Sequence, residues 1–357
     1  MNDGQVREVS LSYRKNVFNN VKRNNEILIY YMSMIAAAVK SKAPQRDIAS
    51  MTKRWKRLER CNQFWQIETY QASRVKVLLK TYLCHDKFCY NCKQVKQLVW
   101  TKRYLPLLEN YRDSMYHITL TVPDCSGEHL PVTLRRMAQC MKRLVGYLYG
   151  DRQLKGLDLA GYGYQGCIRT LEITYNGNMY HPHYHIAAIF TNPAVVEDKC
   201  IDNQFSAYGT KQFSKFETIL QRVWWLLING QRLSYEAIFS ETAEQESYSC
   251  TVDSFQPDDY KKLFSYMIKS HSMENEMMTM EQFQTLYHAL NRVPQIQGYG
   301  VFYNIKAAVD SNDFSDQEYQ EISDLIIPGD QPVRNNEPIG RLAKDSSYTM
   351  VRRKPKD

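Results

Sequence analysis

The sequence predicts an α+β fold with a central antiparallel sheet flanked by helices, preceded by an N-terminal helical and zinc-binding module. Strand patterns at residues 116–122, 166–175 and 184–190 predict the sheet, and the last two flank the turn signal Asn176-Gly177-Asn178. Apolar side chains at helical spacing predict the flanking helices. Four cysteines within residues 61–92 predict the N-terminal module.

The remaining elements follow from local patterns of apolar and turn residues. Stretches with apolar residues every three or four positions predict helices, and short runs rich in β-branched and aromatic residues predict strands. The further predicted strands are residues 64–70, 75–83, 234–239 and 247–252, and the predicted helices are residues 14–40, 93–110, 131–149, 211–229, 257–270 and 281–291.

These elements divide the chain into four parts. A basic helical region at residues 1–60 precedes a cysteine-rich module at 61–110, an α+β core covers 111–308, and a polar tail covers 309–357. The tail is poor in apolar residues, so we expect it to be flexible after Pro328.

Positive charge is concentrated in the N-terminal part. The formal net charge of the chain is +8, yet residues 1–110 alone hold 21 Lys and Arg against 8 Asp and Glu. This asymmetry indicates a basic surface that meets a polyanion. The alternative is a solvated basic face without a partner.

Cysteine usage and apolar runs indicate the compartment. Nine cysteines are an odd number, and several stand alone in apolar surroundings, which is typical of reduced or metal-bound thiols. The longest apolar stretch, residues 27–39, is shorter than the ~20 residues that span a bilayer, and residues 1–20 lack a signal-peptide pattern. We therefore expect a cytoplasmic protein without a membrane partner.

Three histidines lie close together in the run His181-Pro182-His183-Tyr184-His185. Side chains at i and i+2 of a strand share a face, so His183 and His185 present two imidazoles to one cation. Glu172 lies on the neighbouring predicted strand and adds a carboxylate, which makes a site for a divalent cation that polarises phosphate. His181 stays open as a ligand because Pro182 marks the strand start. The alternative is a set of exposed or core histidines without a metal.

A candidate nucleophile lies in the predicted helix at residues 257–270. Tyr266 and Lys269 stand at i and i+3, on one helix face. A phenol with a pKa of about 10 is a weak nucleophile at neutral pH, and a neighbouring ammonium favours its phenolate form. A Tyr-x-x-Lys pattern arises by chance in a chain with 26 tyrosines, so it gains weight only beside the histidine run.

Several elements, in this order, resemble the motifs of plasmid rolling-circle replication initiators of the HUH endonuclease superfamily: residues 116–123, 172–176, 181–185, 266–269 and 292–302. The resemblance implies an HUH-type nuclease core that makes a metal-dependent nick at a plasmid double-strand origin. Tyr266 would become joined to the 5′ phosphate and leave a free 3′-OH primer, while Lys269 assists the charge. Mg²⁺ or Mn²⁺ would be held by His183, His185 and Glu172. The implied partners are double- and single-stranded origin DNA and a host helicase.

One position departs from that family and leaves the termination step open. Relatives often carry a glutamate one turn before the tyrosine, where this chain has Lys262. Asp259, two turns before Tyr266 and on the same helix face, would substitute for that glutamate, or Tyr260 would act as a second nucleophile. Two other interpretations also stay open. One is a mobilisation relaxase or tyrosine transposase of the same superfamily, and the other is a non-catalytic, zinc-dependent DNA-binding regulator.

The cysteines of the module have the spacing of a metal knuckle. Cys84-x4-Cys89-x2-Cys92, with Cys61 upstream, supplies the four thiolates that tetrahedral Zn²⁺ requires, and the family resemblance supports this set. His85 is a competing fourth ligand, and scattered reduced cysteines are the alternative. We expect a structural zinc ion. The nearby cations that we expect to face DNA phosphates are Arg60, Lys76, Lys80, Lys87 and Lys93.

Overall fold

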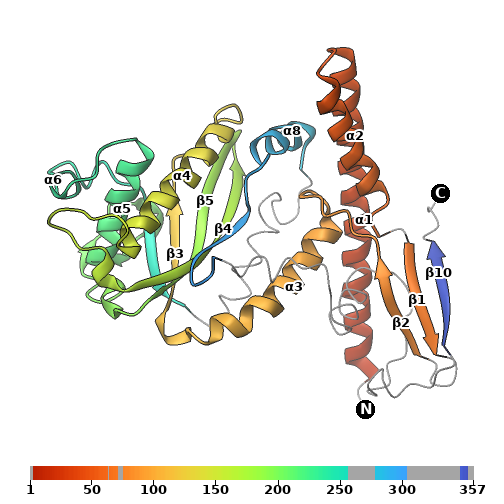
Figure 1. The fold of residues 1–357 in the computed structure, drawn as a ribbon, viewed down its shortest axis with the longest axis horizontal. Coiled ribbons are helices and arrows are strands. Elements are labelled where there is room, and N and C mark those ends of the chain that lie inside the picture. The colour runs from red at the N-terminus through yellow and green to blue at the C-terminus, as the bar shows by residue number, and fades with distance from the viewer. Residues whose placement is uncertain (1–2, 63, 71–74, 256–277, 304–345, 353–357) are drawn as a thin grey trace. The chain divides into compact units, whose positions relative to one another are not determined.

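A five-stranded antiparallel sheet with the strand order β8-β3-β5-β4-β9 forms the centre of residues 100–310 in the computed structural model (Figure 1). The α+β class predicted from the sequence is confirmed. The structure describes residues 3–62, 64–70, 75–255, 278–303 and 346–352. The elements of this part are β3 (Met115–Thr121), α4 (Leu130–Tyr149), β4 (Tyr164–Asn176), β5 (Met179–Phe190), β6 (Ile201–Asp202), β7 (Gln212–Phe213), α5 (Lys215–Ile228), α6 (Tyr235–Ile238), β8 (Cys250–Ser254), α8 (Met280–Ala289) and β9 (Ile296–Gly300).

The predicted hairpin of β4 and β5 is present and longer than the sequence pattern indicates. The strands pair along their length, from Asn176↔Met179 at the turn to Tyr164↔Phe190 at the far end. Gly177 and Asn178 form the two-residue turn with φ of 52° and 77°, and positive φ at both positions is typical of a type I′ hairpin turn. Because β3 pairs with the other side of β5, β5 lies in the middle of the sheet.

The two faces of the sheet differ in character because side chains alternate along each strand. On one face Tyr184 packs against Trp224 of α5, with ring centroids 6.4 Å apart, and the Trp224 indole N–H donates to the carbonyl of Thr121 at 2.7 Å. Helix α4 contacts α5, where the Cys140 thiol donates to the Leu227 carbonyl, and it crosses the sheet in Figure 1. The other face carries the polar side chains of β5, including His183.

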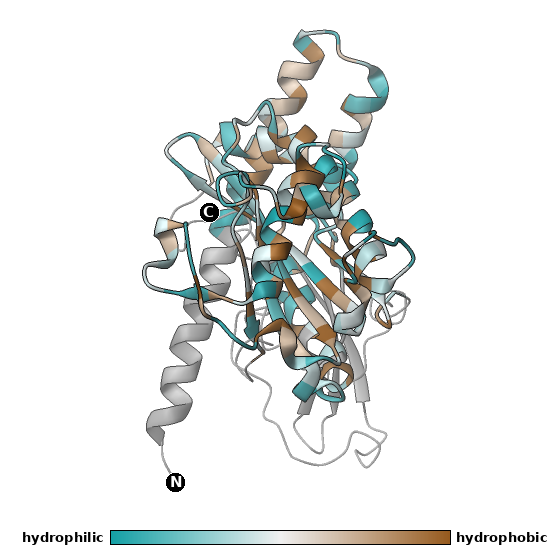
Figure 2. Cartoon of the chain, turned by 90° about the vertical axis from the view of Figure 1, so that its left-hand side faces the viewer, coloured by the Kyte–Doolittle hydropathy of each residue, from teal (hydrophilic) through white to brown (hydrophobic). Residues whose placement is uncertain are grey.

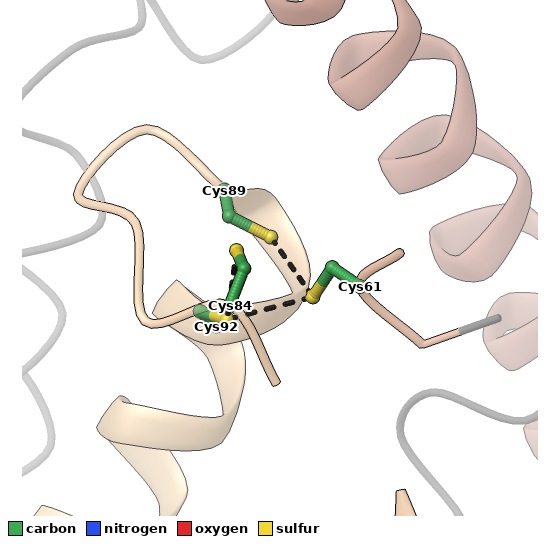
Figure 3. Close-up of side chains that lie close together, drawn as sticks. All are labelled: Cys61, Cys84, Cys89 and Cys92. Atoms are coloured by element: carbon green, nitrogen blue, oxygen red, sulfur yellow. Dashed lines mark hydrogen bonds between the residues drawn. The ribbon is translucent and has the colours of Figure 1, made fainter. Parts of the chain in front are cut away.

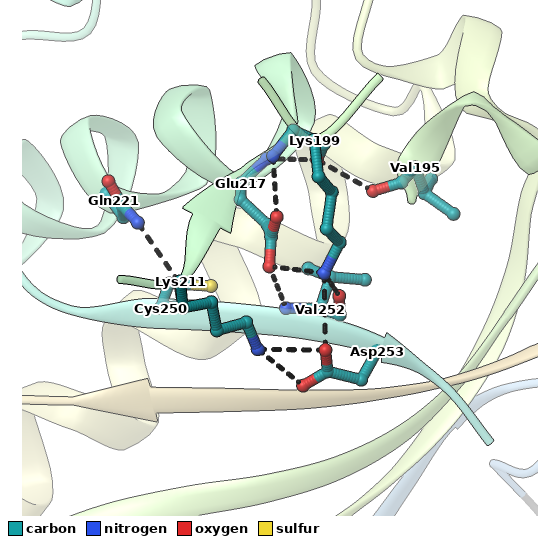
Figure 4. A network of polar contacts seen from close by, with 9 residues as sticks. Val195, Lys199, Lys211, Glu217, Gln221, Cys250, Val252 and Asp253 are labelled. Atoms are coloured by element: carbon teal, nitrogen blue, oxygen red, sulfur yellow. Dashed lines mark hydrogen bonds and ion pairs between the residues drawn. The ribbon is translucent and has the colours of Figure 1, made fainter. Parts of the chain in front are cut away.

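The outer edge of β8 is closed by a network of charges around the buried Glu217 carboxylate (Figure 4). The Glu217 carboxylate is fully buried and accepts from the backbone N–H groups of Val252 and Ser214, both at 2.7 Å. The Lys199 ammonium lies 3.1 Å from that carboxylate and also donates to the Val252 carbonyl. Side chains thus satisfy an edge-strand N–H and C=O that would otherwise be open to another strand. Asp253 joins the network by accepting from Lys199 and Lys211.

Two local predictions in this part need correction or stay open. The predicted strand at residues 234–239 is wrong, because Tyr235–Ile238 form the short helix α6. The Ser234 hydroxyl accepts from the Ala237 N–H at 3.2 Å, and this cap favours a helical turn over an extended chain. The predicted helix at residues 257–270 lies outside the described residues.

A second compact unit comprises residues 1–99 and 311–357, and its boundary with the first falls inside α3. The predicted four-part division has other boundaries and stays a prediction. Helix α1 is apolar towards its C-terminal end, whereas α2 is mostly hydrophilic (Figure 2). None of the described helices has both the length and the apolar composition needed to cross a membrane. The elements are α1 (Asp3–Lys40), α2 (Gln45–Glu59), β1 (Phe64–Tyr70), β2 (Val75–Thr81), α3 (Tyr90–Glu109) and β10 (Ser346–Arg352).

The C-terminal segment contains a strand that the sequence does not predict. β10 pairs antiparallel with β1, from Phe64↔Arg352 to Tyr70↔Ser346, in a three-stranded sheet ordered β10-β1-β2. The expectation of a flexible tail after Pro328 is therefore wrong for Ser346–Arg352. Local composition could not indicate this strand, because its partner lies at the other end of the chain.

We predict that Glu217→Gln lowers the free energy of unfolding by about 2–4 kcal/mol, because it leaves Lys199 without its buried counter-charge and replaces one acceptor oxygen by a donor. Urea denaturation followed by tryptophan fluorescence measures this change. Glu244→Gln, at an exposed position, is the matched control and should have little effect. Equal stability of the two variants would contradict a structural role for the buried carboxylate.

Candidate metal centres

One carboxylate and two imidazoles meet on the polar face of the sheet. The hairpin register places Glu172 opposite His183 and Thr170 opposite His185, so the three candidate ligands lie on adjacent strands. One oxygen of Glu172 (Oε2) is 2.5 Å from His183 Nε2 and 2.8 Å from His185 Nε2. Their ligand atoms all lie within 4.8 Å of one another. The structure therefore brings together the three residues that the sequence predicts as ligands of a divalent cation.

The hydrogen bonds behind the two imidazoles orient their Nε2 atoms towards Glu172. His183 Nδ1 lies 3.3 Å from the carbonyl of His181, and a bond to that acceptor requires the proton on Nδ1. His185 Nδ1 lies 3.2 Å from His117 Nε2, where one ring donates to the other. In the bonds to the Glu172 carboxylate each Nε2 donates. A cation bound in place of those protons would take the Nε2 lone pairs of neutral rings that carry their proton on Nδ1. The donor set thus fits a divalent cation.

His117 is the residue of this cluster that the sequence analysis did not single out. It lies on β3, and its ring stacks against that of His185 with an interplanar angle of 8° and centroids 5.4 Å apart. The Phe255 ring packs edge to face against the His117 ring. The strand pattern places His117 on one face of β3, but only the pairing of β3 with β5 brings it beside His185.

Burial and hydrogen bonding shift the pKa values of Glu172 and His185. Burial alone would raise the pKa of Glu172, but its hydrogen bonds with His183 and His185 outweigh burial and lower the pKa to about 2. Burial lowers the pKa of His185, and the Glu172 carboxylate offsets only part of that effect. An ionised carboxylate and a neutral imidazole are the forms in which these groups bind metal ions.

His181 lies beside the cluster but does not contribute a converging ligand atom. Its Nδ1 lies 2.6 Å from a carboxylate oxygen of Asp124, and its side chain is about a third exposed, at 36%. Its ring centroid is 5.3 Å from that of His183. Its backbone carbonyl, not its ring, makes the contact with His183 Nδ1.

The four predicted cysteine ligands converge in the other unit (Figure 3). Cys61 follows α2, and the other three sulfurs come from the loop before α3 and its first turn. The Cys61 sulfur is 3.5 Å from that of Cys89 and 3.6 Å from that of Cys92, and Cys84 and Cys92 are 3.6 Å apart. Four sulfurs bound at about 2.3 Å to one tetrahedral ion lie about 3.8 Å apart, so the cluster fits zinc geometry. The ring of His85 is not among the converging groups.

Backbone N–H groups donate to two of these sulfurs, as expected around metal thiolates. His85 N–H donates to the Cys92 sulfur at 3.3 Å, and Asp86 N–H donates to the Cys84 sulfur at 3.4 Å. The neighbouring thiols, Cys61 first, lower the pKa of Cys92, whereas burial raises that of Cys89. A cation bound to all four sulfurs would favour the thiolate form of each.

The loop of the cysteine cluster is tied to both N-terminal helices through Asp86. Its carboxylate accepts from the Tyr31 hydroxyl of α1 at 3.0 Å and from Arg54 Nε of α2 at 2.8 Å. The same side chain accepts from the Phe88 N–H at 2.9 Å. The cysteine loop and the α1–α2 helices therefore form one packed structure.

The predicted phosphate-facing cations have different surroundings. Lys93 is buried, its ammonium lies 4.8 Å from the ring centroid of Tyr90, and it has no hydrogen-bond partner among the described residues. Burial lowers the pKa of Lys93 to about 7, so the prediction that it faces DNA is wrong. Arg60 is exposed and Lys87 is half-buried, while the side chains of Lys76 and Lys80 lie outside the described residues.

The predicted nucleophile cannot be placed against the metal cluster. Tyr266 and Lys269 lie outside the described residues, as do Asp259, Tyr260 and Lys262. Their roles remain predictions from the sequence.

Known proteins resemble part of this chain. Residues 75–196, about a third of the chain, match a family model described as "Replication protein". A curated relative from Lentilactobacillus hilgardii, "Protein rep", is 24% identical over 152 residues, which cover 41% of this chain and 45% of that protein. The chain thus matches less than half the length of this relative. No solved structure matches the chain.

The matched segment contains the Glu172, His183 and His185 cluster, whereas Cys61 and Tyr266 lie outside it. The resemblance to plasmid replication initiators that the sequence motifs indicate is confirmed by the family match and the relative.

Proposed function

We propose that this chain, which resembles plasmid replication initiators, starts replication by nicking its origin through metal-dependent attack of Tyr266 on a DNA phosphate. One observation carries the proposal. Glu172, His183 and His185 converge on adjacent strands, in the matched segment, as a buried set of one carboxylate and two imidazoles. A purely structural histidine pair does not need an ionised carboxylate between the two rings.

The residues around the cluster have separate roles in this proposal. Glu172, His183 and His185 hold the ion, and His117 and the carbonyl of His181 keep the imidazoles in the binding tautomer. Mg²⁺ or Mn²⁺ bound there would polarise a phosphate oxygen and offset its charge. Lys269, one helical turn after Tyr266 in the predicted helix, favours the phenolate form of the nucleophile.

In the strand-transfer step one bond to phosphorus forms while another breaks. The Tyr266 phenol oxygen forms a bond to phosphorus and loses its proton, while the bond from phosphorus to the 3′ oxygen breaks. The 3′ oxygen takes up a proton and becomes the free 3′-OH that primes synthesis. The protein keeps the 5′ phosphate as a tyrosine ester, so the reverse reaction can rejoin the strand without another energy source.

The wider assignments belong to the same proposal. The substrate is plasmid origin DNA in double- and single-stranded form, the setting is the cytoplasm, and a host helicase unwinds the nicked duplex. The cysteine cluster holds a structural zinc ion, because its four sulfurs match a tetrahedral arrangement. At termination Asp259 acts in place of the glutamate that Lys262 replaces, or Tyr260 acts as a second nucleophile.

Supercoiled plasmid carrying the DNA that flanks this coding region tests the proposal. With Mn²⁺ we expect relaxation of the plasmid and protein bound covalently to the 5′ end of the nicked strand. Reactions without a divalent ion should leave the plasmid supercoiled. Binding without nicking under all these conditions would contradict the proposal and favour the non-catalytic regulator.

We predict that Tyr266→Phe lowers nicking by at least ~10³-fold and leaves origin binding close to wild type, because only the nucleophilic oxygen is removed. Gel analysis of the covalent protein–DNA adduct measures the first effect, and anisotropy the second. Tyr260→Phe is the matched control. If adduct formation survives in the Tyr266 variant and is lost in the control, Tyr260 is the nucleophile.

We predict that His183→Ala and His185→Ala each abolish Mn²⁺-dependent cleavage, whereas His181→Ala lowers it less than ~10-fold. The His181 variant keeps the backbone carbonyl that accepts from His183 Nδ1. Cleavage rates at increasing Mn²⁺ concentrations measure these effects, and exposed His129→Ala is the control. Loss of cleavage in all three cluster variants would make His181 a ligand or an essential support.

We predict that Cys89→Ser lowers zinc content below one ion per chain and weakens duplex origin binding about 10-fold, because serine is a poor zinc ligand. Cleavage of a short single-stranded oligonucleotide should survive better, since its chemistry depends on the other unit. Exposed Cys200→Ser controls for the loss of a thiol. Unchanged zinc content in the Cys89 variant would rule out the cysteine site.

A further inference from the structure

One face of α2 carries a row of exposed cations. Lys53, Lys56, Arg57 and Arg60 are spaced by three and four residues, so they follow one side of the helix over about 10 Å. All four are exposed, and none of them pairs with a carboxylate in the part of the chain that the structure describes. An unpaired row of this kind is available to an external anion.

The same side chains line a groove, which we call the α2 groove. Its volume is about 440 Å³, and its lining includes the four cations with Thr52 and Tyr82. Tyr82 is 40% exposed and forms the wall that does not belong to α2. The groove is therefore a concave basic surface with hydroxyl groups beside the cations.

The opposite side of α2 is anchored, which keeps the row facing outwards. Met51 and Leu58 are buried on that side. Arg54, although adjacent in sequence to Lys53, points inwards to Asp86 and stacks over the Tyr31 ring, 5.4 Å from its centroid. The helix thus uses one arginine for internal packing and leaves the other cations to solvent.

Both walls of the groove end at the cysteine cluster. Arg60 directly precedes Cys61, and Tyr82 lies two residues before Cys84. The backbone N–H of Asn62 donates to the carbonyl of Tyr82 at 2.8 Å and joins the walls. The contacts among the cysteine sulfurs consequently hold the groove in shape.

We propose that the α2 groove binds the phosphate backbone of double-stranded DNA. Each strand of a duplex carries a phosphate about every 3.4 Å along its axis, so a row of four cations over about 10 Å matches about three successive phosphates. A single strand is held mainly by stacking of its bases on several aromatic rings, and among the described residues that line the groove only Tyr82 has an aromatic ring. The inference rests on the proposed function for the class of partner.

Anisotropy of a labelled duplex of arbitrary sequence tests this surface, because phosphate contacts do not depend on sequence. Lys56→Ala combined with Arg57→Ala should weaken binding at least ~10-fold near 0.1 M salt. The slope of log affinity against log salt should fall by about 2, since two phosphate contacts are lost. Lys22→Ala combined with Lys40→Ala removes two exposed cations of α1 and should leave both quantities close to wild type.

Equal losses in the two double variants, or an unchanged salt slope in the groove variant, would overturn the proposal. A loss confined to single-stranded DNA would also overturn it and assign the groove to that ligand. Cleavage of a short single-stranded oligonucleotide, measured on the same proteins, separates this inference from the nicking proposal. A wild-type protein that binds duplex through the groove and does not cleave would contradict only the nicking proposal.

Discussion

The pairing of β5 on both sides is the constraint on which the rest of the sheet and its site depend. Hydrogen bonding to β3 and β4 fixes the register of β5, and a slip by one residue would exchange its two faces. In the observed register Tyr184 enters the core beside Trp224, while His183 and His185 reach Glu172 on the other face. Packing of Tyr184 in the apolar core therefore also positions His183 and His185, because alternate side chains of one strand are fixed to opposite faces of the sheet.

The two candidate metal-ligand clusters use different physical means of pre-organisation. The histidine cluster relies on sheet register and on hydrogen bonds from behind the rings, with His117 supporting His185. The cysteine cluster joins Cys61 to a loop more than 20 residues later and receives backbone N–H groups at its sulfurs. Asp86 extends that second cluster to α1 and α2, so the basic face of α2 and the sulfurs share one support.

Some charged side chains of this protein are paired with a buried partner, and others are exposed to solvent. Glu217 and Lys199 are paired inside the protein, where they close the edge of β8, and Arg54 is paired with Asp86. The cations of the α2 groove are exposed and unpaired among the described residues. They place part of the positive charge of the N-terminal region at the protein surface. Composition alone does not show which N-terminal cations are exposed, because Lys93 is buried over the Tyr90 ring.

Local sequence was sufficient for features whose cause is local. The Asn176-Gly177-Asn178 turn, the alternation of His183 and His185, and the close approach of Cys84, Cys89 and Cys92 each depend on residues near one another in sequence, and each is found as predicted. The support of His185 by His117 and the pairing of β10 with β1 depend on contacts between distant segments. The capped turn of α6 was missed for another reason, since a short run of mixed residues carries no clear period. Residue spacing thus identifies the candidate ligands, whereas strand order and register, which arise only when the whole chain packs, determine their neighbours.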